Sequence, residues 1–312
     1  MTSGSPTVNR ESRQAPASHR RSSPPGAALG AEPLVSVVIT TYNRPALLLQ
    51  AIQSVRNQTY GSIEIIVVDD GSSVDIGQAV LAHDRDIVVI RNTETRGANY
   101  SRNAGIARAK GEIIAFLDDD DEWLPNKLTE QVALLRDADA CLCGYKVLET
   151  GKVRTHDITE ITAGHLRQGN PFCGASGFAV RRHVFDRIRF DDALWIGQDW
   201  DIYVQIVGEF RLKYTSTPLF LYRKGQQSLS NQLYRDDSKF VASKLASLEK
   251  NRAFLGEFHY GVRVAGTYLR FIGTRGGRIR RILSTIQKAG FAPTVYFLYQ
   301  KLTQRDGVRF SS

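Results

Sequence analysis

The sequence predicts an α/β protein whose Rossmann-like, mainly parallel sheet is flanked by helices, with a helical extension at the C-terminus. Two observations carry this prediction. Short β-branched runs alternate with stretches of helical period, as in βαβ units. Polar clusters follow several of these runs, as at the carboxyl ends of strands in an open parallel sheet. With 312 residues, 42% of them hydrophobic and 23% charged, the chain is long enough to bury a substantial core.

The first strand is expected at residues 34–40, a β-branched run of the kind that is buried on both faces in a parallel sheet. In the helix that follows, we expect Asn43 to cap the N-terminus and Pro45 to lie in the first turn. Three further strands are expected at residues 63–68, 87–90 and 113–117, and two further helices near Gly97 and after Pro125. Residues 1–33 are rich in Ser, Pro, Arg, Ala and Gly and are expected to be a disordered leader.

The charge is unevenly distributed along the chain. The net charge is +9, of which residues 1–33 carry +2, residues 34–249 carry −3 and residues 250–312 carry +10. A nucleic-acid-binding domain would carry its basic patch on the folded core, so nucleic acid is not an expected partner. The basic C-terminal region mixes Arg with aliphatic and aromatic residues. It is therefore either an amphipathic segment for anionic lipid or a helical pair that packs on the domain with solvated Arg faces.

The cysteine count and the hydropathy pattern indicate a cytoplasmic protein. Cys141, Cys143 and Cys173 leave an odd thiol under any pairing and match no zinc-finger spacing. We read Cys173 as a small buried side chain rather than a nucleophile. No run reaches the length of a membrane-spanning helix, and the first thirty residues lack the apolar core of a secretory signal.

Four consecutive aspartates, Asp118–Asp121, directly follow the strand expected at 113–117. Their mutual repulsion would oppose folding unless a positive charge lies among them, and a divalent cation is the natural candidate. Carboxylate oxygens favour Mn²⁺ or Mg²⁺, which keep open positions for water and phosphate. The alternative is a solvated acidic turn that caps the next helix.

Three other polar segments follow the expected strands or lie between them. Asp70, in Asp-Asp-Gly-Ser, is either plain turn chemistry or an acceptor for a nucleotide base or ribose. Tyr42 is either a core aromatic or a platform on which a base stacks. In the Gly-rich segment 96–105, Arg102 and Asn103 can donate to phosphate or ribose oxygens, although neither a P-loop nor a dinucleotide fingerprint is present.

Together these motifs resemble glycosyltransferase family 2, the inverting enzymes of the GT-A fold. The resemblance spans roughly residues 34–235 and rests on four motifs in the family's order and on one later segment. They are Ser36–Arg44 (SVVITTYNR), Val67–Ser72 (VVDDGS), Ser101–Gly105 (SRNAG), Phe116–Trp123 (FLDDDDEW) and Phe190–Asp201 (FDDALWIGQDWD).

The resemblance implies a role for each site residue. Thr40, Tyr42 and Asp70 would hold the base of a nucleoside-diphosphate sugar, usually a UDP-sugar. Asp118 and Asp120 would be the metal pair, with Asp120 the direct ligand, and Asp119 would lie near the ribose. Arg102 remains a candidate phosphate or ribose donor, and Asp199 would be the catalytic base. From the residues alone, Asp199 and Asp201 could instead cap a helix whose apolar face includes Ile202, Ile206 and Val207.

Two departures from the family pattern concern the acceptor side. Gln198 stands where the family often has Glu, and residues 222–230 lack the His that relatives place before Ser-Leu-Ser, which puts an imidazole metal ligand in doubt. The small residues of Pro171–Gly177 are expected to line the acceptor pocket. His156, His165 and His183 have no metal-ligand spacing and are expected on the surface or in loops.

The resemblance implies an enzyme that transfers a sugar from a UDP-sugar to a hydroxyl of a glycan or lipid-linked glycan, as in surface-polysaccharide assembly. Residues 34–125 would be the nucleotide-sugar half, 126–235 the acceptor half and 236–312 a basic helical region. The absence of a spanning segment and the basic tail suit a peripheral position at the inner membrane face. The rival functions are a sugar-nucleotide pyrophosphorylase and a non-enzymatic lipid- or nucleic-acid-binding module.

Overall fold

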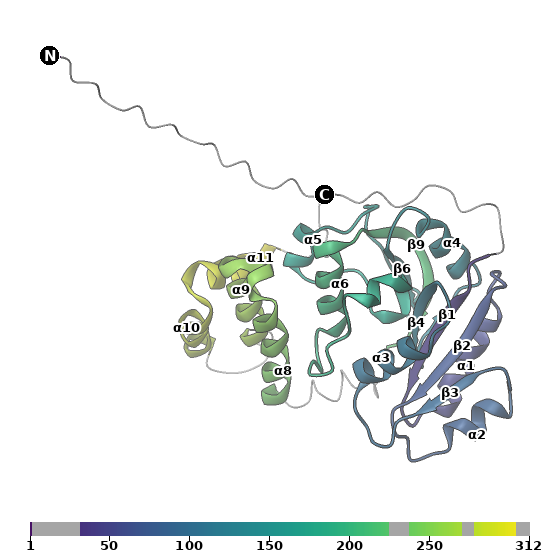
Figure 1. Cartoon of the computed structure of the whole chain (residues 1–312). Helices are drawn as coiled ribbons and strands as arrows, with labels where there is room; N and C mark the ends of the chain where they lie inside the picture. The colour runs from purple at the N-terminus through teal and green to yellow at the C-terminus, as the bar shows by residue number, and fades with distance from the viewer. Residues whose placement is uncertain (2–31, 225–236, 270–277, 304–312) are drawn as a thin grey trace. The chain divides into compact units, whose positions relative to one another are not determined.

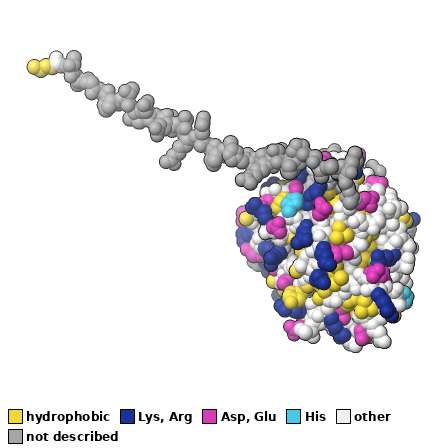
Figure 2. All heavy atoms as spheres, turned by 45° about the vertical axis from the view of Figure 1, so that its right-hand side comes forward, with side chains coloured by type: hydrophobic (Ala, Val, Ile, Leu, Met, Phe, Trp, Pro, Cys, Tyr) yellow, Lys and Arg dark blue, Asp and Glu magenta, His cyan; other side chains and the backbone are white. Residues whose placement is uncertain are grey.

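The described part of the chain is built around one mixed sheet, flanked by helices (Figure 1). The structure is a computed structural model that describes residues 1, 32–224, 237–269 and 278–303, and residues 33–312 form one compact unit. On the face shown in Figure 2, basic and acidic side chains are interspersed. Most of the expected leader, and residues 225–230 of the segment without His, lie outside the described residues.

The first half of the sheet is parallel, as predicted. The strands are β1 (Val35–Thr41), β2 (Ile63–Asp69), β3 (Val88–Arg91) and β4 (Ile113–Asp118), in the order β3-β2-β1-β4. All seven residues of β1 are buried because β2 and β4 pair with its two edges and helices cover its faces.

The second half of the sheet is mixed, and the sequence patterns did not predict its strands. From β4 the sheet continues in the order β8-β6-β9-β5, with β7 paired to β6. β8 is antiparallel to β4, whereas β6 and β9 are parallel to each other. The bounds are β5 (Glu122–Trp123), β6 (Ala140–Val147), β7 (Val153–Arg154), β8 (Ala179–Arg181) and β9 (Leu212–Tyr222).

Helix α1 (Pro45–Arg56) begins at its proline as predicted, but the predicted cap is wrong. The N-cap is Arg44, without a side-chain hydrogen bond to the helix. Asn43 has a left-handed backbone with φ 55°, and its side-chain oxygen accepts from the backbone N–H and hydroxyl of Ser73. Asn43 therefore joins the loop after β1 to the loop after β2 instead of capping α1.

Helix α3 (Ala98–Arg108) lies close against β1 and β2 because it contains Gly105. A Cβ at this glycine would lie 2.4 Å from Cγ1 of Val38, so no larger residue fits without displacing the helix. The helix starts near Gly97, as predicted, and Gly97 is its N-cap, with φ 91°. The close packing fixes where α3 presents its polar side chains at the edge of the sheet.

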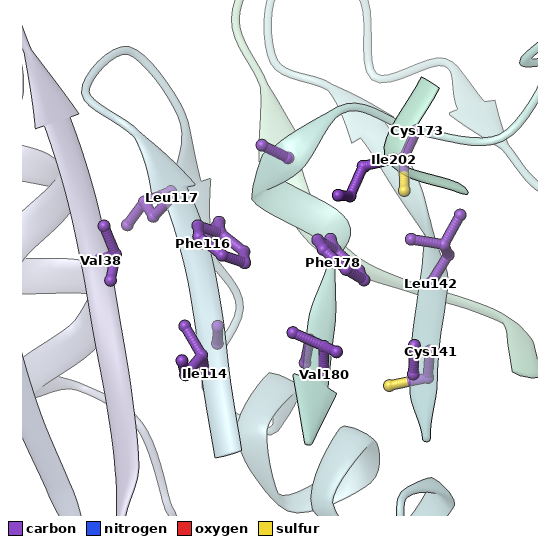
Figure 3. Close-up of a cluster of buried hydrophobic side chains, with 14 of the residues drawn as sticks. Val38, Ile114, Phe116, Leu117, Cys141, Leu142, Cys173, Phe178, Val180 and Ile202 are labelled. Carbon is purple, nitrogen blue, oxygen red and sulfur yellow. The ribbon is translucent and has the colours of Figure 1, made fainter. Parts of the chain in front are cut away.

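The hydrophobic core extends across both halves of the sheet (Figure 3). Phe116 of β4 stacks on Phe178, with ring centroids 5.4 Å apart. Cys141, Cys143 and Cys173 are free and buried, and burial holds the pKa of the Cys173 thiol well above its usual value. The prediction that Cys173 is a buried side chain is thus confirmed, and no disulfide joins the three.

The remaining helices cover the sheet or form the C-terminal region. They are α2 (Ile76–Leu81), α4 (Lys127–Leu134), α5 (Ala163–Gln168), α6 (Gln198–Glu209), α8 (Asp237–Lys250), α9 (Arg252–Tyr268), α10 (Arg278–Ala289) and α11 (Phe291–Thr303), with short 3₁₀ turns at Ala175–Gly177 and Arg182–Asp186. In Figure 1, α8–α11 form a group at the opposite end from β3. In the part of the chain that the structure describes, no helix is long and apolar enough to cross a membrane.

A buried polar cluster ties the C-terminal helices to α6. Asp201 of α6 is 1% exposed, and its carboxylate accepts from Lys250 Nζ at 2.8 Å and from Asn251 Nδ2 at 2.7 Å. Lys250 also pairs with Asp191 at 2.7 Å. The helix pair α8–α9 is therefore held to the rest of the protein by charge-assisted bonds as well as by apolar contacts.

Candidate active site

The candidate site lies where β1, β2 and β4 end. The parallel register places Thr40 opposite Asp118 and Thr41 opposite Asp69. Polar residues that are widely separated in the sequence are thus brought to one sheet edge, as the sequence predicted.

Arginine and threonine side chains hold the acidic turn Asp118–Asp121. Arg44 Nη1 lies 3.1 Å from Asp119 Oδ1 and 3.0 Å from Asp120 Oδ2. Thr41 Oγ1 donates to Asp119 Oδ2 at 2.7 Å. Burial raises the pKa of Asp119 to about 6, although Arg44 and Thr41 oppose the rise.

The other side of this turn is held from the end of β9. Arg223 donates its backbone N–H to Asp121 Oδ1 at 2.9 Å, its Nε to the carbonyl of Asp120 at 3.0 Å and its Nη2 to Glu122 Oε1 at 2.7 Å. Arg44 and Arg223 therefore supply the positive charge that was expected among the acidic residues, and folding alone does not require a dication there. The alternative of a merely solvated turn is wrong, since Asp119 and Asp121 are buried.

The predicted metal ligands, Asp118 and Asp120, have carboxylate oxygens that could bind a divalent ion. Asp118 Oδ1 is bound by Arg102 and Asp120 Oδ2 by Arg44, so each carboxylate keeps a second oxygen clear of these arginines. Burial and the neighbouring Asp118 raise the pKa of Asp120, as expected of closely spaced carboxylates. Within residues 32–224, 237–269 and 278–303, no three His, Cys, Asp or Glu side chains are grouped to hold a metal. The residues therefore fit an ion that takes its remaining ligands from water and a diphosphate.

Arg102 lies between Asp118 of the predicted metal pair and the predicted base, Asp199. It is 4% exposed, its Nη2 donates to Asp118 Oδ1 at 2.8 Å, and its Nη1 lies 3.9 Å from Asp199 Oδ1. Despite burial, which opposes the charged form, Asp118 and Asp199 raise the pKa of Arg102. The guanidinium is thus a fixed positive charge between two carboxylates that come from opposite halves of the sequence.

Asp199 lies in the first turn of α6 but does not cap it. The N-cap is Gly197, with no side-chain hydrogen bond, and Asp199 Oδ1 is a buried atom without a hydrogen-bond partner. Burial raises the pKa of Asp199 to about 6, with Arg102 lowering it and Asp118 raising it. The helix-cap alternative also fails for Asp201, which binds Lys250 and Asn251. A carboxylate with one uncommitted oxygen is suited to take a proton from a substrate.

Asp70 organises the start of α3. Its Oδ1 accepts from Asn92 Nδ2, the backbone N–H of Arg96 and Ser101 Oγ, at 2.8, 3.0 and 3.1 Å. Its Oδ2 accepts from the backbone N–H of Gly97 at 2.8 Å. Since a carboxylate oxygen has two lone pairs, Oδ2 can still accept a bond from a ligand.

Thr40 and Tyr42 lie on either side of the end of β1. Thr40 is nearly buried, whereas Tyr42 is 37% exposed and donates its backbone N–H to Asp119 Oδ2 at 3.4 Å. The alternative that Tyr42 is a core aromatic is therefore wrong. Its ring is available for a stacking contact.

The segment Pro171–Gly177 approaches both Asp118 and Asp199. Ser176 Oγ accepts the backbone N–H of Asp118 at 3.1 Å, and a Cβ at Gly174 would lie 3.4 Å from Asp199 Oδ2. This segment therefore borders the site next to Asp118 and Asp199.

A buried pair beneath this segment supports it. Lys127 Nζ donates to Gln131 Oε1 at 2.6 Å, and Gln131 Nε2 donates to the carbonyl of Gly177 at 2.8 Å. Burial lowers the pKa of Lys127 to about 8, and its ammonium lies 3.8 Å from the centre of the Trp123 ring. The bond from Gln131 thus fixes the carbonyl of Gly177, at the end of the segment that borders the site.

Sequence reasoning missed several residues and misassigned one. Asn103, expected to face phosphate, instead donates to the carbonyl of Phe190 and to Asp192. Arg44 belongs to the first family motif, but no role was predicted for it. Its position just after the end of β1, at the sheet edge where the polar residues gather, could have indicated one. Ser176 and Arg223 carried no such signal, because their contacts with the acidic turn arise only from the tertiary fold.

Comparisons with known proteins indicate the family and the fold of the chain. The sequence profile of Glycosyl transferase family 2 matches residues 36–189. The chain is 37% identical over 237 residues to the GalNAc(5)-diNAcBac-PP-undecaprenol beta-1,3-glucosyltransferase of Campylobacter jejuni, covering 72% of each protein.

Two solved structures share the fold. Residues 1–349 of S. aureus TarS, in complex with UDP-GlcNAc, superpose with a TM-score of 0.66 at 18% identity, covering 86% of this chain and 85% of that one. The mannosyltransferase PcManGT of Pyrobaculum calidifontis, in complex with GDP-Man and Mn²⁺, superposes with a TM-score of 0.57 at 18% identity, covering 88% and 81%.

Proposed function

Because the chain belongs to glycosyltransferase family 2 and has the GT-A fold, we propose that it transfers a sugar from a UDP-sugar to a hydroxyl of a glycan or lipid-linked glycan, with inversion. Membership of this family makes the protein a glycosyltransferase, which overturns the pyrophosphorylase and the non-enzymatic binding module as alternatives. The donor, the metal, the acceptor and the stereochemistry are the parts that we propose.

The observation that carries the proposal is the position of Arg102. Its guanidinium binds Asp118 at 2.8 Å and approaches Asp199 to 3.9 Å. A transferase needs charge stabilisation at the leaving diphosphate next to a base at the acceptor hydroxyl. Asp118, through the metal ion it would hold, and Asp199, as the base, would serve these two functions within the reach of one side chain.

On the donor side, Tyr42 would stack on the base while Thr40 and the free lone pair of Asp70 Oδ2 bind its polar edge. Asp119 would lie at the ribose, and Arg102 would contribute positive charge near the phosphates. TarS was solved with UDP-GlcNAc, which supports a uridine nucleotide in this fold.

Asp118 and Asp120 would hold Mn²⁺ or Mg²⁺, which when bound would stabilise the negative charge of the leaving diphosphate. The presence of Mn²⁺ in the PcManGT complex supports a divalent ion. Asp199 would accept the proton of the acceptor hydroxyl as that oxygen attacks the anomeric carbon. One base and one in-line displacement invert the configuration, so an α-linked donor gives a β-linked product.

The acceptor is proposed to be lipid-linked, because the C. jejuni relative is named for an undecaprenol-diphosphate glycan. Pro171–Gly177 would border the acceptor pocket. Such an acceptor would place the enzyme in the cytoplasm, at the inner membrane face. We retain the division into residues 34–125 for the donor, 126–235 for the acceptor and 236–312 as the helical region.

The test is calorimetric titration of the full chain with UDP, with and without Mn²⁺. We expect binding to be at least tenfold tighter with Mn²⁺, and EDTA to remove the gain. Asp120→Asn should lose the Mn²⁺ dependence, while the exposed Asp186→Asn should keep it. Equal UDP affinity with and without the ion would contradict the metal assignment, and no binding of any uridine nucleotide would contradict the donor assignment.

A further inference from the structure

We propose that α10 and α11 form a docking surface for an anionic phospholipid bilayer, which extends the proposed peripheral position but does not depend on which sugar is transferred. These helices lie at the end of the molecule farthest from β3 (Figure 1). Of the fifteen large apolar side chains that are exposed among the described residues, seven lie on these two helices.

Four of the five exposed apolar residues of α11 form a single stripe. Phe291, Val295, Tyr299 and Leu302 are 68%, 46%, 63% and 67% exposed. At about 100° per residue they fall within an arc of about 80° on the helix. Thr294 is buried on another side, where α11 packs against α9. The stripe is therefore a face that the described fold leaves uncovered.

Helix α10 adds a second apolar pair with a basic flank. Ile279 and Leu283 are 76% and 59% exposed and lie one turn apart. The exposed Arg280 flanks them, while Thr285 and Ala289 are buried. Such a helix lies in the membrane interface with its apolar side chains inserted and its basic side chains at the headgroups.

Charge selects a bilayer as the occupant rather than a second copy of the chain. The sequence between Glu257 and Asp306 has nine Lys or Arg residues and no Asp or Glu. Two copies meeting through this region would bring like charges together, whereas anionic headgroups neutralise them. An apolar stripe within a uniformly basic segment is the combination that anionic lipid recognises.

The test is co-sedimentation of the full chain with phosphatidylcholine vesicles, pure or containing about 30% phosphatidylglycerol. We expect at least about tenfold stronger partition into the anionic vesicles, weakening as salt rises. The triple variant F291S/Y299S/L302S should lose at least about tenfold in partition. Arg280→Gln should lose about fivefold.

Matched controls alter exposed positions elsewhere, namely Leu81→Ser on α2 and Arg136→Gln after α4, and should partition as the unaltered protein does. Melting temperature and UDP binding, measured on the same samples, report folding and the proposed function separately. Equal partition into both vesicle types, or undiminished binding by the triple variant, overturns the proposal. Self-association that the triple variant abolishes, without vesicle binding, would assign the stripe to contact between copies instead.

Discussion

Arg102 illustrates how the site depends on single side chains. It carries the positive charge nearest to both Asp118 and Asp199, and it is almost fully buried. A guanidinium suits this position because its planar array of donors can serve two acceptors at once, which an ammonium cannot do in the same geometry. Asp199, by contrast, has a buried oxygen, Oδ1, that accepts no hydrogen bond.

At this scale we predict that Asp199→Asn lowers kcat by about 100- to 10,000-fold, since an amide cannot take the acceptor proton. The dissociation constant for UDP with Mn²⁺ should change by less than about threefold, because Asp199 is assigned to the acceptor side. Transfer assays and titrations would measure the two quantities. Asp186→Asn, at an exposed position, should leave both unchanged. Turnover that survives Asp199→Asn would remove the residue from the role of base.

The same residue predicts a pH dependence. Burial raises the pKa of Asp199 to about 6, so the base is ionised at pH 7 and becomes protonated as the pH falls through 6. We expect kcat/KM to fall at least about tenfold per pH unit below this value, and the fall to be shallower in the residual activity of Asp199→Asn, where Asp119, whose pKa burial also raises to about 6, still titrates. A pH–rate profile at saturating Mn²⁺ measures this. A profile that stays level down to pH 5 would contradict the assignment.

At the scale of elements, the close approach of α3 to β1 positions Arg102. Gly105 makes this approach possible, because a Cβ there would meet Val38 at 2.4 Å. We predict that Gly105→Ala lowers the free energy of unfolding by about 1–3 kcal/mol through overpacking. Gly208→Ala in α6, where nothing lies within 4 Å, should be neutral or stabilise by up to about 1 kcal/mol. Urea unfolding of the two variants tests the contrast, and equal effects would contradict it.

The elements also show what sequence patterns can and cannot predict. β1, β2, β3 and β4 fall within one or two residues of their expected bounds, because buried β-branched runs are a local signal. β9 was not predicted because a polar Thr-Ser-Thr-Pro stretch interrupts its apolar residues, and its pairing with β6 is long-range. The prediction that Asn43 caps α1 was wrong for a related reason. Its side chain bonds to Ser73, thirty residues away in the sequence, and no local pattern reports such a contact.

At the scale of the whole molecule, the charge segregation seen in the sequence has a structural counterpart. The mildly acidic part contains the sheet and the candidate site, and the basic part contains α9, α10 and α11. The two parts are joined at Asp201, which is 1% exposed and accepts from Lys250 and Asn251.

We therefore predict that Asp201→Asn lowers the free energy of unfolding by about 1.5–3 kcal/mol, because it removes the charge from a buried set of hydrogen bonds. Denaturant unfolding would measure the loss. Asp186→Asn, exposed on the surface, should stay within about 0.5 kcal/mol of the parent. A loss no larger in Asp201→Asn than in Asp186→Asn would show that the join contributes little.

The junction at Asp201 has a consequence for exchanging parts between relatives. A chimera whose crossover lies near residue 236 would keep Asp201 from this chain. The residues at positions 250 and 251, which donate to Asp201 here, would come from the other parent. Unless that parent has donors at the same positions, the carboxylate of Asp201 in the hybrid would be buried with fewer hydrogen bonds. An exchange of acceptor preference should therefore move α6 together with the junction of α8 and α9 at Lys250 and Asn251.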